Sequence, residues 1–523
     1  MTDGASVADV TPVPLKTWVA VGGALLGAFM AVLNIQITNT ALPYIEGGIS
    51  TGGVYGTWIS TAYLIGEIIV VPLADFFSHA FSLRRYLLAN IALFLLFSVL
   101  CGQAHSLGEM IVLRALQGFT GGVLIPLAFT IIFSMLPPSK HAAGLAGFAV
   151  TAVFAPAIGP TIGGYLNDSY GWPWVFYVNV VPGVIMLGAL LYSLPHEPMH
   201  LSLLRRADWR GIGLMAVGLA ALQTVLDDGN VYDWFGSPYI VKLSLVAAVA
   251  LGAFVIAEFI TPEPVVNFRL LGRRNFGFGT LGNFLFGFAL YAAAYLLPQY
   301  LAVTQGFDAE QSGEVMAWTG WPQLVVIPFV PFLMKRIDTR MLVIIGLLVY
   351  ATSCFMSVHL DVNFAAPQLF WPDVTRAVGV ALVLTPLSAI AMSGITRDEA
   401  GAASGIFNMT RNLGGAIGTA AVQTFFTKRE QFHSYIMNQH VSVLQPATRD
   451  QLVHLQQHFM AQGFPSPAGA LHRAIVAIGH VVRAQATISG YADCFALLGV
   501  VLIAAIVPVA LLRKGSATGG AAH

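Results

Sequence analysis

The sequence has little charge and few cysteines. Only 10% of its 523 residues are charged, whereas soluble domains average about 25%. Lys plus Arg and Asp plus Glu balance at 25 each, which leaves no net charge for binding nucleic acid. The three cysteines are scattered in or beside apolar runs, so they make neither a disulfide framework nor a paired metal motif. With 56% apolar residues the chain has too little polar surface for water, and this predicts an all-α integral membrane protein.

Catalytic patterns are also missing. The sequence shows no paired-acid constellation, nucleophile elbow, phosphate loop or Cys/His metal set. We therefore expect no enzyme and no cofactor or metal. The first apolar run lacks a convincing cleavage site for a signal peptidase, so it is predicted to be the first membrane span.

Fourteen apolar runs approach the length of about 20 residues that crosses a bilayer. They lie at 18–39, 55–76, 84–103, 108–131, 143–166, 174–194, 209–226, 239–260, 277–302, 313–334, 341–359, 373–394, 401–426 and 490–512. Basic residues precede the first run and follow the even-numbered ones, whereas the intervening short loops carry acids. Because Lys and Arg accumulate in cytoplasmic loops, both termini are predicted to be cytoplasmic.

A long polar segment, 427–489, separates the last two runs on the predicted outer side. It is compatible with helix and holds six of the thirteen histidines. His454 and His458 have the i, i+4 spacing that can seat a metal, but no Cys or acidic cluster supports such a site. A solvated helix is the favoured interpretation.

Two charged residues stand out inside the apolar runs of the first half of the chain. Glu67 lies in "YLIGEIIVVPL", and Arg114 begins "RALQGFTGGVLIP". A buried arginine in a span costs several kcal/mol unless it faces a cavity or an acid, and the alternative is a side chain that extends to the nearby interface. In "APAIGPTIGGYL", Gly159 and Gly163 permit close helix packing, and Pro160 is expected to bend its helix.

These motifs together resemble one family. The pattern R-x-x-Q-G-x-x-G-G in the fourth run and G-P-x-x-G-G in the fifth resemble the major facilitator superfamily drug:proton antiporters. "LNIQITNTALP", "GWPWVFYVNVVPG", "LDDGNVYDWFGS" and "GAASGIFNMTRNLGGAIGTA" are similar to the fourteen-helix EmrB/QacA-type exporters. "KREQFH" and the long outer segment most resemble the Gram-negative EmrB subgroup. The resemblance covers nearly the whole chain.

The resemblance implies both a fold and an activity. It implies two six-helix bundles, 1–195 and 276–523, with two extra central helices in 196–275. Substrate is expected between the bundles, with alternating access by rocking. The implied activity is export of hydrophobic or amphipathic toxic compounds across a bacterial inner membrane, driven by the proton gradient. A periplasmic adaptor and an outer-membrane channel are implied partners, with the segment 427–489 as the docking surface.

The chain departs from the family at two places. The family motif between the second and third spans is mostly lost from "ADFFSHAFSLRRYLL", which predicts a weaker or differently built gate. The usual first-helix Asp is Asn34, which cannot release a proton. A carboxylate in a low-dielectric site can load and unload protons, so we hypothesise that Glu67 has taken over this role with Arg114 adjusting its proton affinity. The alternative is a structural glutamate.

Further residues are candidates for the site. Glu314 is either a second acid or an interfacial residue, and Asp373 is expected to pair with Arg376 one turn away. The proton-coupling candidates are therefore Glu67, Arg114, Glu314 and Asp373. The substrate-cavity candidates are Asn34, Gln36, Asn39, Gln117, Tyr291, Tyr295 and Arg411. The motif residues with a structural role are Gly118, Gly122, Pro126, Gly159, Pro160, Gly163 and Gly164.

Two other functions stay open at this point. One is export of a single endogenous metabolite, which sequence cannot separate from multidrug export. The other is a non-transporting sensor or assembly subunit, which the lost gate motif and Asn34 favour and the retained Arg114, Gln117 and Pro160 oppose.

Overall fold

The protein is described here from a computed structural model. The structure describes residues 13–51, 55–206, 208–261, 264, 266–362, 364–396, 399–442, 444–462 and 466–513. Each of the fourteen predicted runs coincides with a helix or with a short series of helices. The all-α prediction is confirmed for these residues.

The first six runs form an N-terminal group of helices. Apolar residues dominate each of them, and Pro, Gly or polar residues separate them. The group comprises α1 (Leu15–Gly48), α2 (Trp58–Val70) with η2 (Val71–Leu73) and α3 (Ala74–Phe81), α4 (Leu83–Cys101), α5 (Leu107–Gly121) with α6 (Leu124–Met135), η3 (Pro138–Lys140), α7 (His141–Tyr170), and α8 (Trp174–Tyr177) with α9 (Val180–Ser193).

Two further long helices follow, and then a C-terminal group. The central elements are α10 (Ser202–Arg206), α11 (Trp209–Asp228), η4 (Trp234–Gly236), α12 (Pro238–Ile260) and η5 (Phe268–Gly272). The C-terminal group comprises α13 (Arg274–Gln305), α14 (Ala309–Val326) with η6 (Ile327–Phe329) and α15 (Val330–Arg336), α16 (Thr339–Met356) with η7 (Ser357–His359), α17 (Ala366–Ala391), α18 (Ala400–His440), α19 (Pro446–Ala461) and α20 (Pro467–Ala510).

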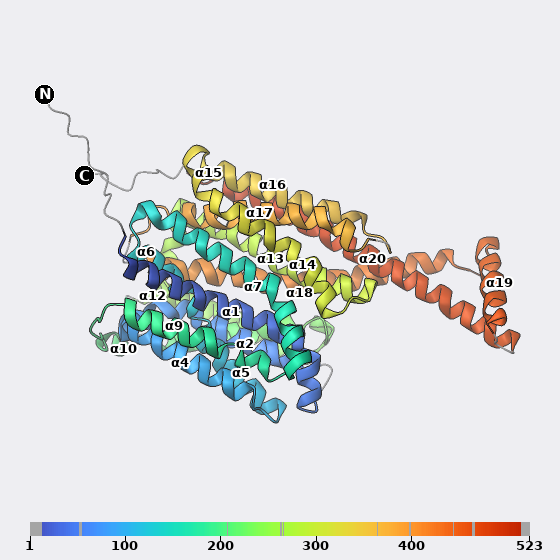
Figure 1. The fold of residues 1–523 in the computed structure, drawn as a ribbon, viewed down its shortest axis with the longest axis horizontal. Coiled ribbons are helices and arrows are strands. Elements are labelled where there is room, and N and C mark those ends of the chain that lie inside the picture. Colours follow the sequence, from blue (N-terminus) through green and yellow to red (C-terminus); the bar gives the residue numbers. More distant parts are fainter. Residues whose placement is uncertain are drawn as a thin grey trace.

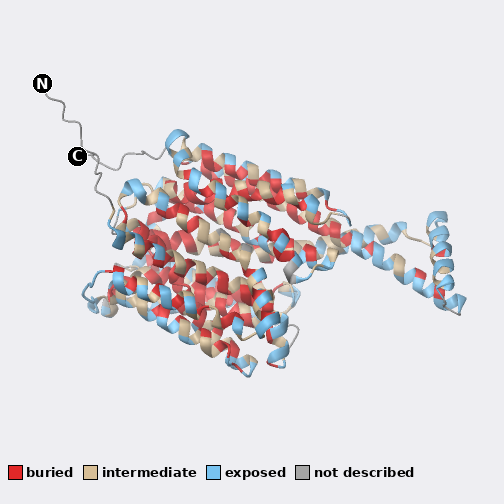
Figure 2. Ribbon diagram, in the orientation of Figure 1, coloured by how far each residue is buried: buried red, intermediate tan, exposed pale blue. Residues whose placement is uncertain are grey.

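The two groups lie side by side with their helices roughly aligned (Figure 1). Helix α7 packs along α14 where the groups meet, and α11 packs on α2. The loop between α11 and α12 is tied to the C-terminal group, because Trp234 Nε1 donates to Thr424 Oγ1 at 2.9 Å. Buried residues gather inside the bundle, whereas much of its outer surface is exposed and apolar (Figure 2). That distribution suits a protein surrounded by lipid.

Fewer helices qualify as membrane spans by hydropathy than the fourteen predicted runs that coincide with helices. Twelve described helices are long and apolar enough to cross a membrane, or thirteen when the bent α7 region counts as one span. Helix α18 is absent from this set although it belongs to the bundle. It carries buried Ser404, Asn408 and Arg411, and these polar side chains lower its hydropathy. Fourteen spans therefore stay a prediction.

Contacts between helix ends agree with the predicted up-and-down order. The start of α1 lies near the end of α9, with Lys16 Nζ 5.9 Å from the Tyr192 ring. The start of α4 reaches the same end of α9, where Arg84 Nη1 donates to the Leu194 carbonyl at 2.8 Å. Arg274 at the start of α13 donates to the Leu511 carbonyl at 2.8 Å.

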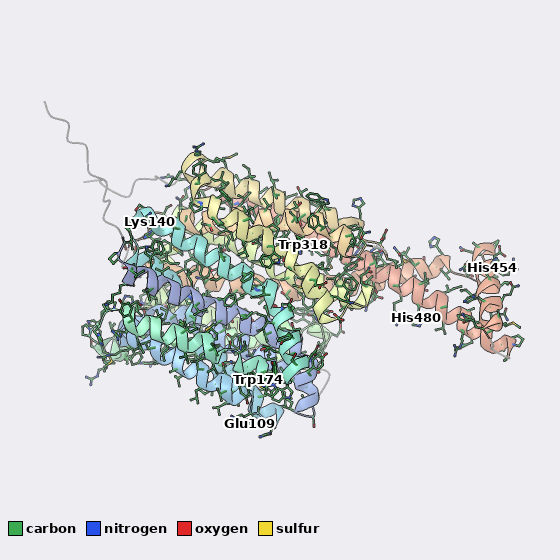
Figure 3. The ribbon with its side chains drawn as sticks, viewed as in Figure 1. Glu109, Lys140, Trp174, Trp318, His454 and His480 are labelled. Carbon is green, nitrogen blue, oxygen red and sulfur yellow. The ribbon has the colours of Figure 1, made fainter. Side chains whose placement is uncertain are left out.

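The two ends of the described chain lie at one end of the bundle. Gly401 at the start of α18 contacts the Asp75 side chain on α3. This contact places the start of α4 and the end of α9 at the same end of the bundle as the start of α13 and the end of α20. Lys140 lies at this end, whereas Glu109 and Trp174 lie at the opposite end (Figure 3). The assignment of this end to the cytoplasm remains a prediction from the positive-inside rule.

The segment 427–489 is a helical extension in its described parts. Helix α18 continues to His440, and α20 begins at Pro467, far outside the apolar run. Helix α19 packs on α20, with Leu452 and Ala474 buried between them. The extension projects from the bundle beyond the end at which Glu109 and Trp174 lie, and it carries His454 and His480 (Figure 3). At its base Asp493 on α20 accepts from Arg429 Nε at 2.5 Å and lies 2.7 Å from His433 Nε2.

Candidate functional site

Arg114 lies deep in the N-terminal group. Its side chain on α5 is 1% exposed, which excludes extension to the interface. Its Nη1 donates to Asn34 Oδ1 at 2.7 Å and to Gln117 Oε1 at 2.6 Å, and its Nε donates to the Ile59 carbonyl at 3.1 Å. Arg114 is therefore bonded to neutral oxygens from α1, α2 and α5.

Aromatic rings and a second layer of amides complete the Arg114 centre. Its Cζ lies 4.4 Å from the Tyr63 ring centroid and 5.6 Å from that of Phe176, and such faces attract cations. Gln117 Nε2 donates to Ser98 Oγ at 2.7 Å, which fixes the amide so that its oxygen points at Arg114. Ser98 is also 3.5 Å from Asn179 Nδ2. Neither Ser98 nor Asn179 was predicted to join the site, since each is a single polar residue in an apolar run.

Three glycines bring α2 and α5 close enough to form this centre. A Cβ at Gly118 would overlap the Tyr63 carbonyl, and one at Gly66 would overlap the Ala115 carbonyl. Gly122 lies against Glu67 in the same way, with its ideal Cβ position 2.9 Å from the Glu67 Cα. Gly118 and Gly122 are thus required by close approach rather than by an unusual backbone angle.

Glu67 faces the other group of helices rather than Arg114. It is 5% exposed, and its Oε1 accepts from Asn412 Nδ2 on α18 at 3.4 Å. Its Oε2 has no hydrogen-bond partner among the described residues. Arg411 on α18 and Arg114 both interact with it through space. Of the candidate residues Asn34 and Glu67, only Asn34 is therefore hydrogen-bonded to the Arg114 guanidinium among the described contacts.

A chain of polar side chains joins Glu67 to α13. Tyr291 donates from its hydroxyl to Asn412 Oδ1 at 3.3 Å, and Asn412 donates in turn to Glu67. Tyr291 is 39% exposed as a residue, so the chain leads from a buried carboxylate to a partly exposed tyrosine. Sequence reasoning missed Asn412, although it stands next to Arg411 within an unusually polar run.

Arg411 lies beside this chain and is also buried. Its Nη2 donates to Asn408 Oδ1 at 2.8 Å, while its Nη1 has no partner among the described residues. Asn408 Nδ2 donates to the Ser404 carbonyl, and Ser404 Oγ donates to the Pro126 carbonyl of α6 at 3.2 Å. Helix α18 therefore contacts the N-terminal group through both Asn412 and Ser404.

The other cavity candidates lie outside these networks. Asn39 is exposed and accepts from Ser60 Oγ at 2.6 Å. Gln36 packs against Gly159 of α7, and Gly163 packs against Ile37, so these glycines serve the α1–α7 contact. Tyr295 is partly buried against the main hydrophobic core. Pro160 lies within the bent region of α7, where the axis turns by 43° between Pro138–Pro156 and Ile158–Tyr170.

The predicted pair on α17 is present. Arg376 Nη2 lies 3.6 Å from Asp373 Oδ1, and the two residues are 5% and 0% exposed. Glu314 is exposed instead, beside a cavity of about 260 Å³ lined by Phe307 and Trp318. Its position agrees with the interfacial alternative.

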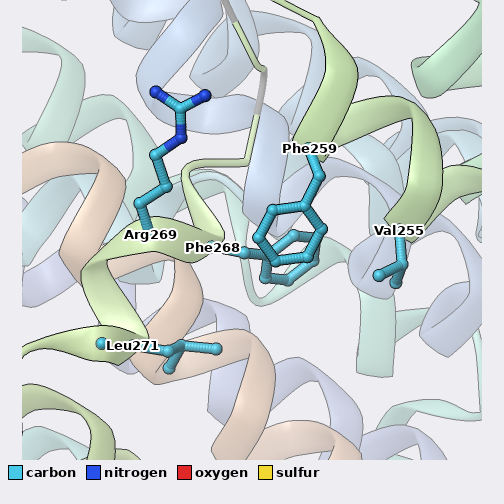
Figure 4. A pocket seen from close by; sticks show the side chains of 6 residues that line it. Val255, Phe259, Phe268, Arg269 and Leu271 are labelled. Atoms are coloured by element: carbon cyan, nitrogen blue, oxygen red, sulfur yellow. The ribbon is translucent and has the colours of Figure 1, made fainter.

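A larger hollow of about 460 Å³ lies on α12 and η5, away from all of these residues. There Phe259 and Phe268 stack with centroids 6.3 Å apart, and Arg269 points away from them (Figure 4). Within the described residues no group of three or more His, Cys, Asp or Glu is placed to hold a metal ion.

The region of the lost gate motif still connects the two groups. Asp75 on α3 lies against Gly401 of α18, and Arg84 donates to the carbonyls of Leu191 and Leu194 at the end of α9. The contact between groups at this end is thus built from Asp75 and a glycine of α18. The expectation of a weaker or differently built gate stays a prediction.

Comparison with known proteins supports the same architecture. Residues 24–419 match the family model of the Major Facilitator Superfamily. The chain is 30% identical to the "Colistin resistance protein EmrB" of Acinetobacter baumannii over 94% of this chain and 95% of that protein. It is 30% identical to the "Fatty acid resistance protein FarB" of Neisseria gonorrhoeae over 98% and 99% of the two chains. It is 32% identical to the "Multidrug export protein EmrB" of Escherichia coli over 80% and 82%.

A solved structure shows the same fold at much lower sequence identity. The crystal structure of the human organic anion transporter MFSD10 superposes with a TM-score of 0.56 and 15% identity, covering 94% of this chain and all of that one. The chain belongs to the EmrB-type branch of the Major Facilitator Superfamily and is a multi-pass protein of the bacterial inner membrane.

Proposed function

We propose that this protein exports hydrophobic or amphipathic toxic compounds in exchange for protons, and that Glu67 carries the proton. The observation that carries the proposal is the position of Glu67, which is buried on α2. One of its oxygens has no hydrogen-bond partner in the part of the chain that the structure describes, and the other lies 3.4 Å from Asn412. A charged carboxylate in such a place lacks the hydrogen bonds that offset burial, whereas a protonated one carries no net charge.

The contact between Glu67 and Asn412 joins the N-terminal group to the C-terminal group. Rocking of residues 1–195 against 276–523, with 196–275 between them, changes this contact. Glu67 then meets a different environment in each state, which alternating access requires of a proton carrier. Arg411 adds a positive charge near the carboxylate in the state described here.

The proton gradient is sufficient for useful export. One proton crossing 100 mV is worth about 2.3 kcal/mol, and each 1.4 kcal/mol is about tenfold in concentration. A single coupled proton can therefore sustain a substrate ratio of tens-fold, before any pH gradient is added.

The substrate class is inferred from the interior and the relatives. The names of the relatives mention colistin resistance, fatty acid resistance and multidrug export. Among the charged residues described in the bundle, Glu67 stands near two arginines, Arg114 and Arg411. Two arginines beside one carboxylate suit weak acids and neutral hydrophobes better than dications.

The test is dye efflux from proteoliposomes with an imposed pH gradient. Glu67→Gln is expected to bind the dye but to lose the response to the gradient. Asn34→Asp in the Glu67→Gln background restores the response in part, because it returns a carboxylate to the first helix. Asn39→Asp serves as the matched control, because Asn39 is exposed and lies outside the Arg114 centre. Normal coupling in Glu67→Gln would contradict the role of Glu67.

We also propose that the helical extension binds a periplasmic adaptor. Its exposed faces on α19 and α20 project beyond the bundle, away from the substrate region (Figure 1). Replacing residues 437–482 with a short linker leaves the Arg429, His433 and Asp493 cluster in place. The shortened protein is expected to transport in proteoliposomes but to fail in resistance assays on whole cells. Full resistance in cells would contradict docking at this extension.

A further inference from the structure

The fourth predicted spans of the two groups carry the same sequence features. In α5 and α6 the order is Arg114-Ala115, Gly118 and then Pro126-Leu127. In α17 it is Arg376-Ala377, Gly379 and then Pro386-Leu387. Transporters of this kind are built from internal repeats, so the two arginines occupy related places in the two groups.

The two glycines have the same structural task. Gly118 lies against the Tyr63 backbone of α2, and Gly379 lies against the Tyr350 backbone of α16, where a Cβ would be 2.6 Å from the nitrogen. Each tyrosine then donates from its hydroxyl to a backbone carbonyl, Tyr63 to Ala31 at 3.4 Å and Tyr350 to Ala289 at 3.1 Å. Arginine, glycine and tyrosine thus recur together.

The partners of the two arginines differ. Arg114 is bonded to neutral amide and carbonyl oxygens, whereas Arg376 lies beside a carboxylate. The Arg376–Asp373 distance of 3.6 Å is an ion-pair distance but too long for a hydrogen bond. Both Asp373 oxygens, and Nε and Nη2 of Arg376, have no hydrogen-bond partner among the described residues.

Among the described residues, the surroundings of Asp373 offer it no charged group besides Arg376. The titratable groups that face the pair are Tyr350 and Cys354 of α16, and α20 contributes the Phe495 ring 5.7 Å from the Arg376 Cζ. Tyr350 already donates to Ala289 of α13. The other described charged side chains on helices packed on α17 are exposed, except Arg340 on α16, which is half-buried and pairs with Asp338. The exposed ones are Glu314 on α14, Asp168 on α7, Arg274 on α13, and Lys335 and Arg336 on α15.

A buried ion pair without supporting hydrogen bonds is a poor source of stability. The attraction must offset the desolvation of both charges, and it does so only when hydrogen bonds satisfy the remaining polar atoms. The pair is therefore poised between two arrangements. In one, Asp373 is ionised beside Arg376; in the other, Asp373 has taken up a proton and Arg376 is free to turn to other acceptors.

We propose that Asp373, in the C-terminal group, is a second carboxylate that carries a proton, and that Arg376 turns away from it when it is protonated. The step adds one proton to a carboxylate oxygen and removes it later, with Arg376 charged throughout. The inference rests on the proposed function, because it assigns a second proton to the same transport cycle. It predicts that each cycle uses one more proton than Glu67 alone supplies.

The experiment measures the substrate ratio that a pH gradient sustains. Proteoliposomes with the membrane potential clamped at zero are loaded with a membrane-soluble dye, the neutral dye Nile red first among a panel. One coupled proton is worth a factor of about ten in the limiting ratio per pH unit. Asp373→Asn is therefore expected to lower the sustained ratio about tenfold at a gradient of one pH unit, with dye binding retained.

A double variant separates this role from a structural one. Asp373→Asn leaves Arg376 unpaired, so the loss could come from misfolding, and Asp373→Asn with Arg376→Gln removes both charges. A structural pair predicts that the double variant recovers the wild-type ratio together with stability. A proton carrier predicts that stability recovers while the ratio stays about tenfold low. A wild-type ratio in either variant overturns the inference.

The same assay separates the two proposals. A wild-type protein that transports no dye of the panel against its gradient overturns the proposed function, and this inference with it. Normal coupling in Glu67→Gln together with the tenfold loss in Asp373→Asn overturns the role of Glu67 and supports that of Asp373. Loss in Glu67→Gln with a wild-type ratio in Asp373→Asn overturns only the inference made here.

Discussion

The two buried arginines are held in opposite ways. Arg114 donates three hydrogen bonds to the neutral oxygens of Asn34, Gln117 and Ile59. Arg376 lies beside Asp373, and neither carboxylate oxygen accepts a hydrogen bond from any described residue. The first arrangement does not change when a proton arrives, because no member of it titrates near neutral pH. The second contains a group that can gain or lose a proton.

The difference shows how one architecture can separate the holding of helices by an arginine from the binding of a proton by a carboxylate. A fixed arginine centre organises α1, α2 and α5, and the nearby carboxylate Glu67 is left to face α18. The C-terminal group keeps acid and arginine together on one helix, one turn apart. The Arg114 centre forms with Asn34 in place of a first-helix acid, because the Asn34 oxygen still accepts a hydrogen bond from Arg114. Asn34 and Arg114 can therefore coexist in a proton-driven transporter.

The largest expected effect comes from removing the arginines themselves. Arg114→Met leaves the oxygens of Asn34, Gln117 and Ile59 buried without their donor, and each unsatisfied group costs about 1–3 kcal/mol. Arg376→Met leaves only Asp373, which can become neutral by taking up a proton. Thermal unfolding in detergent is expected to show a much larger loss of stability for Arg114→Met. Equal losses would mean that the two centres are held alike.

A smaller effect is expected from the glycines that seat the two centres. Gly118→Ala places a methyl group against the Tyr63 carbonyl, and Gly379→Ala places one against the Tyr350 backbone. Overpacking of this kind costs about 1–3 kcal/mol. Gly118→Ala is expected to lose stability and transport together, because the same approach of α2 and α5 brings Glu67 against Gly122.

Gly108→Ala is the matched control for both glycine variants. It lies on α5 with open space around its ideal Cβ position, so it should leave stability and transport unchanged. If Gly379→Ala lost transport while Gly118→Ala kept it, the C-terminal centre would be the more constrained of the two.

The sequence predicts these helices well because apolar runs and flanking basic residues are local signals. It also predicts that Arg114 is interior, since the family motif places it on a packed face. It does not predict that Glu67 meets Asn412, because these residues are 345 positions apart and their contact depends on how the two groups pack. It does predict helix in 427–489, where no Gly or Pro interrupts the polar end of α18, but the apolar run alone does not predict that one unbroken helix continues from the bundle to His440.

The smallest effect concerns an ion pair outside the membrane. Arg273 donates to Glu399 through Nη1 at 2.8 Å and Nη2 at 2.6 Å, which ties the start of α13 to the turn before α18. These bonds, with those from Thr396, hold the pKa of the Glu399 carboxyl below its usual range. The pair is partly exposed, so it contributes at most about 1 kcal/mol.

A lowered pKa fixes the sign of its pH dependence. The stabilisation is present above the pKa of glutamate in the unfolded chain, about 4.3, and it is lost as the pH falls through the lower value of the folded protein. Glu399→Gln should therefore lower the midpoint of thermal unfolding slightly at pH 7, and this difference from wild type should shrink below about pH 4. A difference that grew on acidification would reverse the assigned sign. In contrast to this surface pair, removing the buried Asp373 carboxylate is expected to change transport more than stability, because the protonated form of Asp373 is part of the proposed cycle.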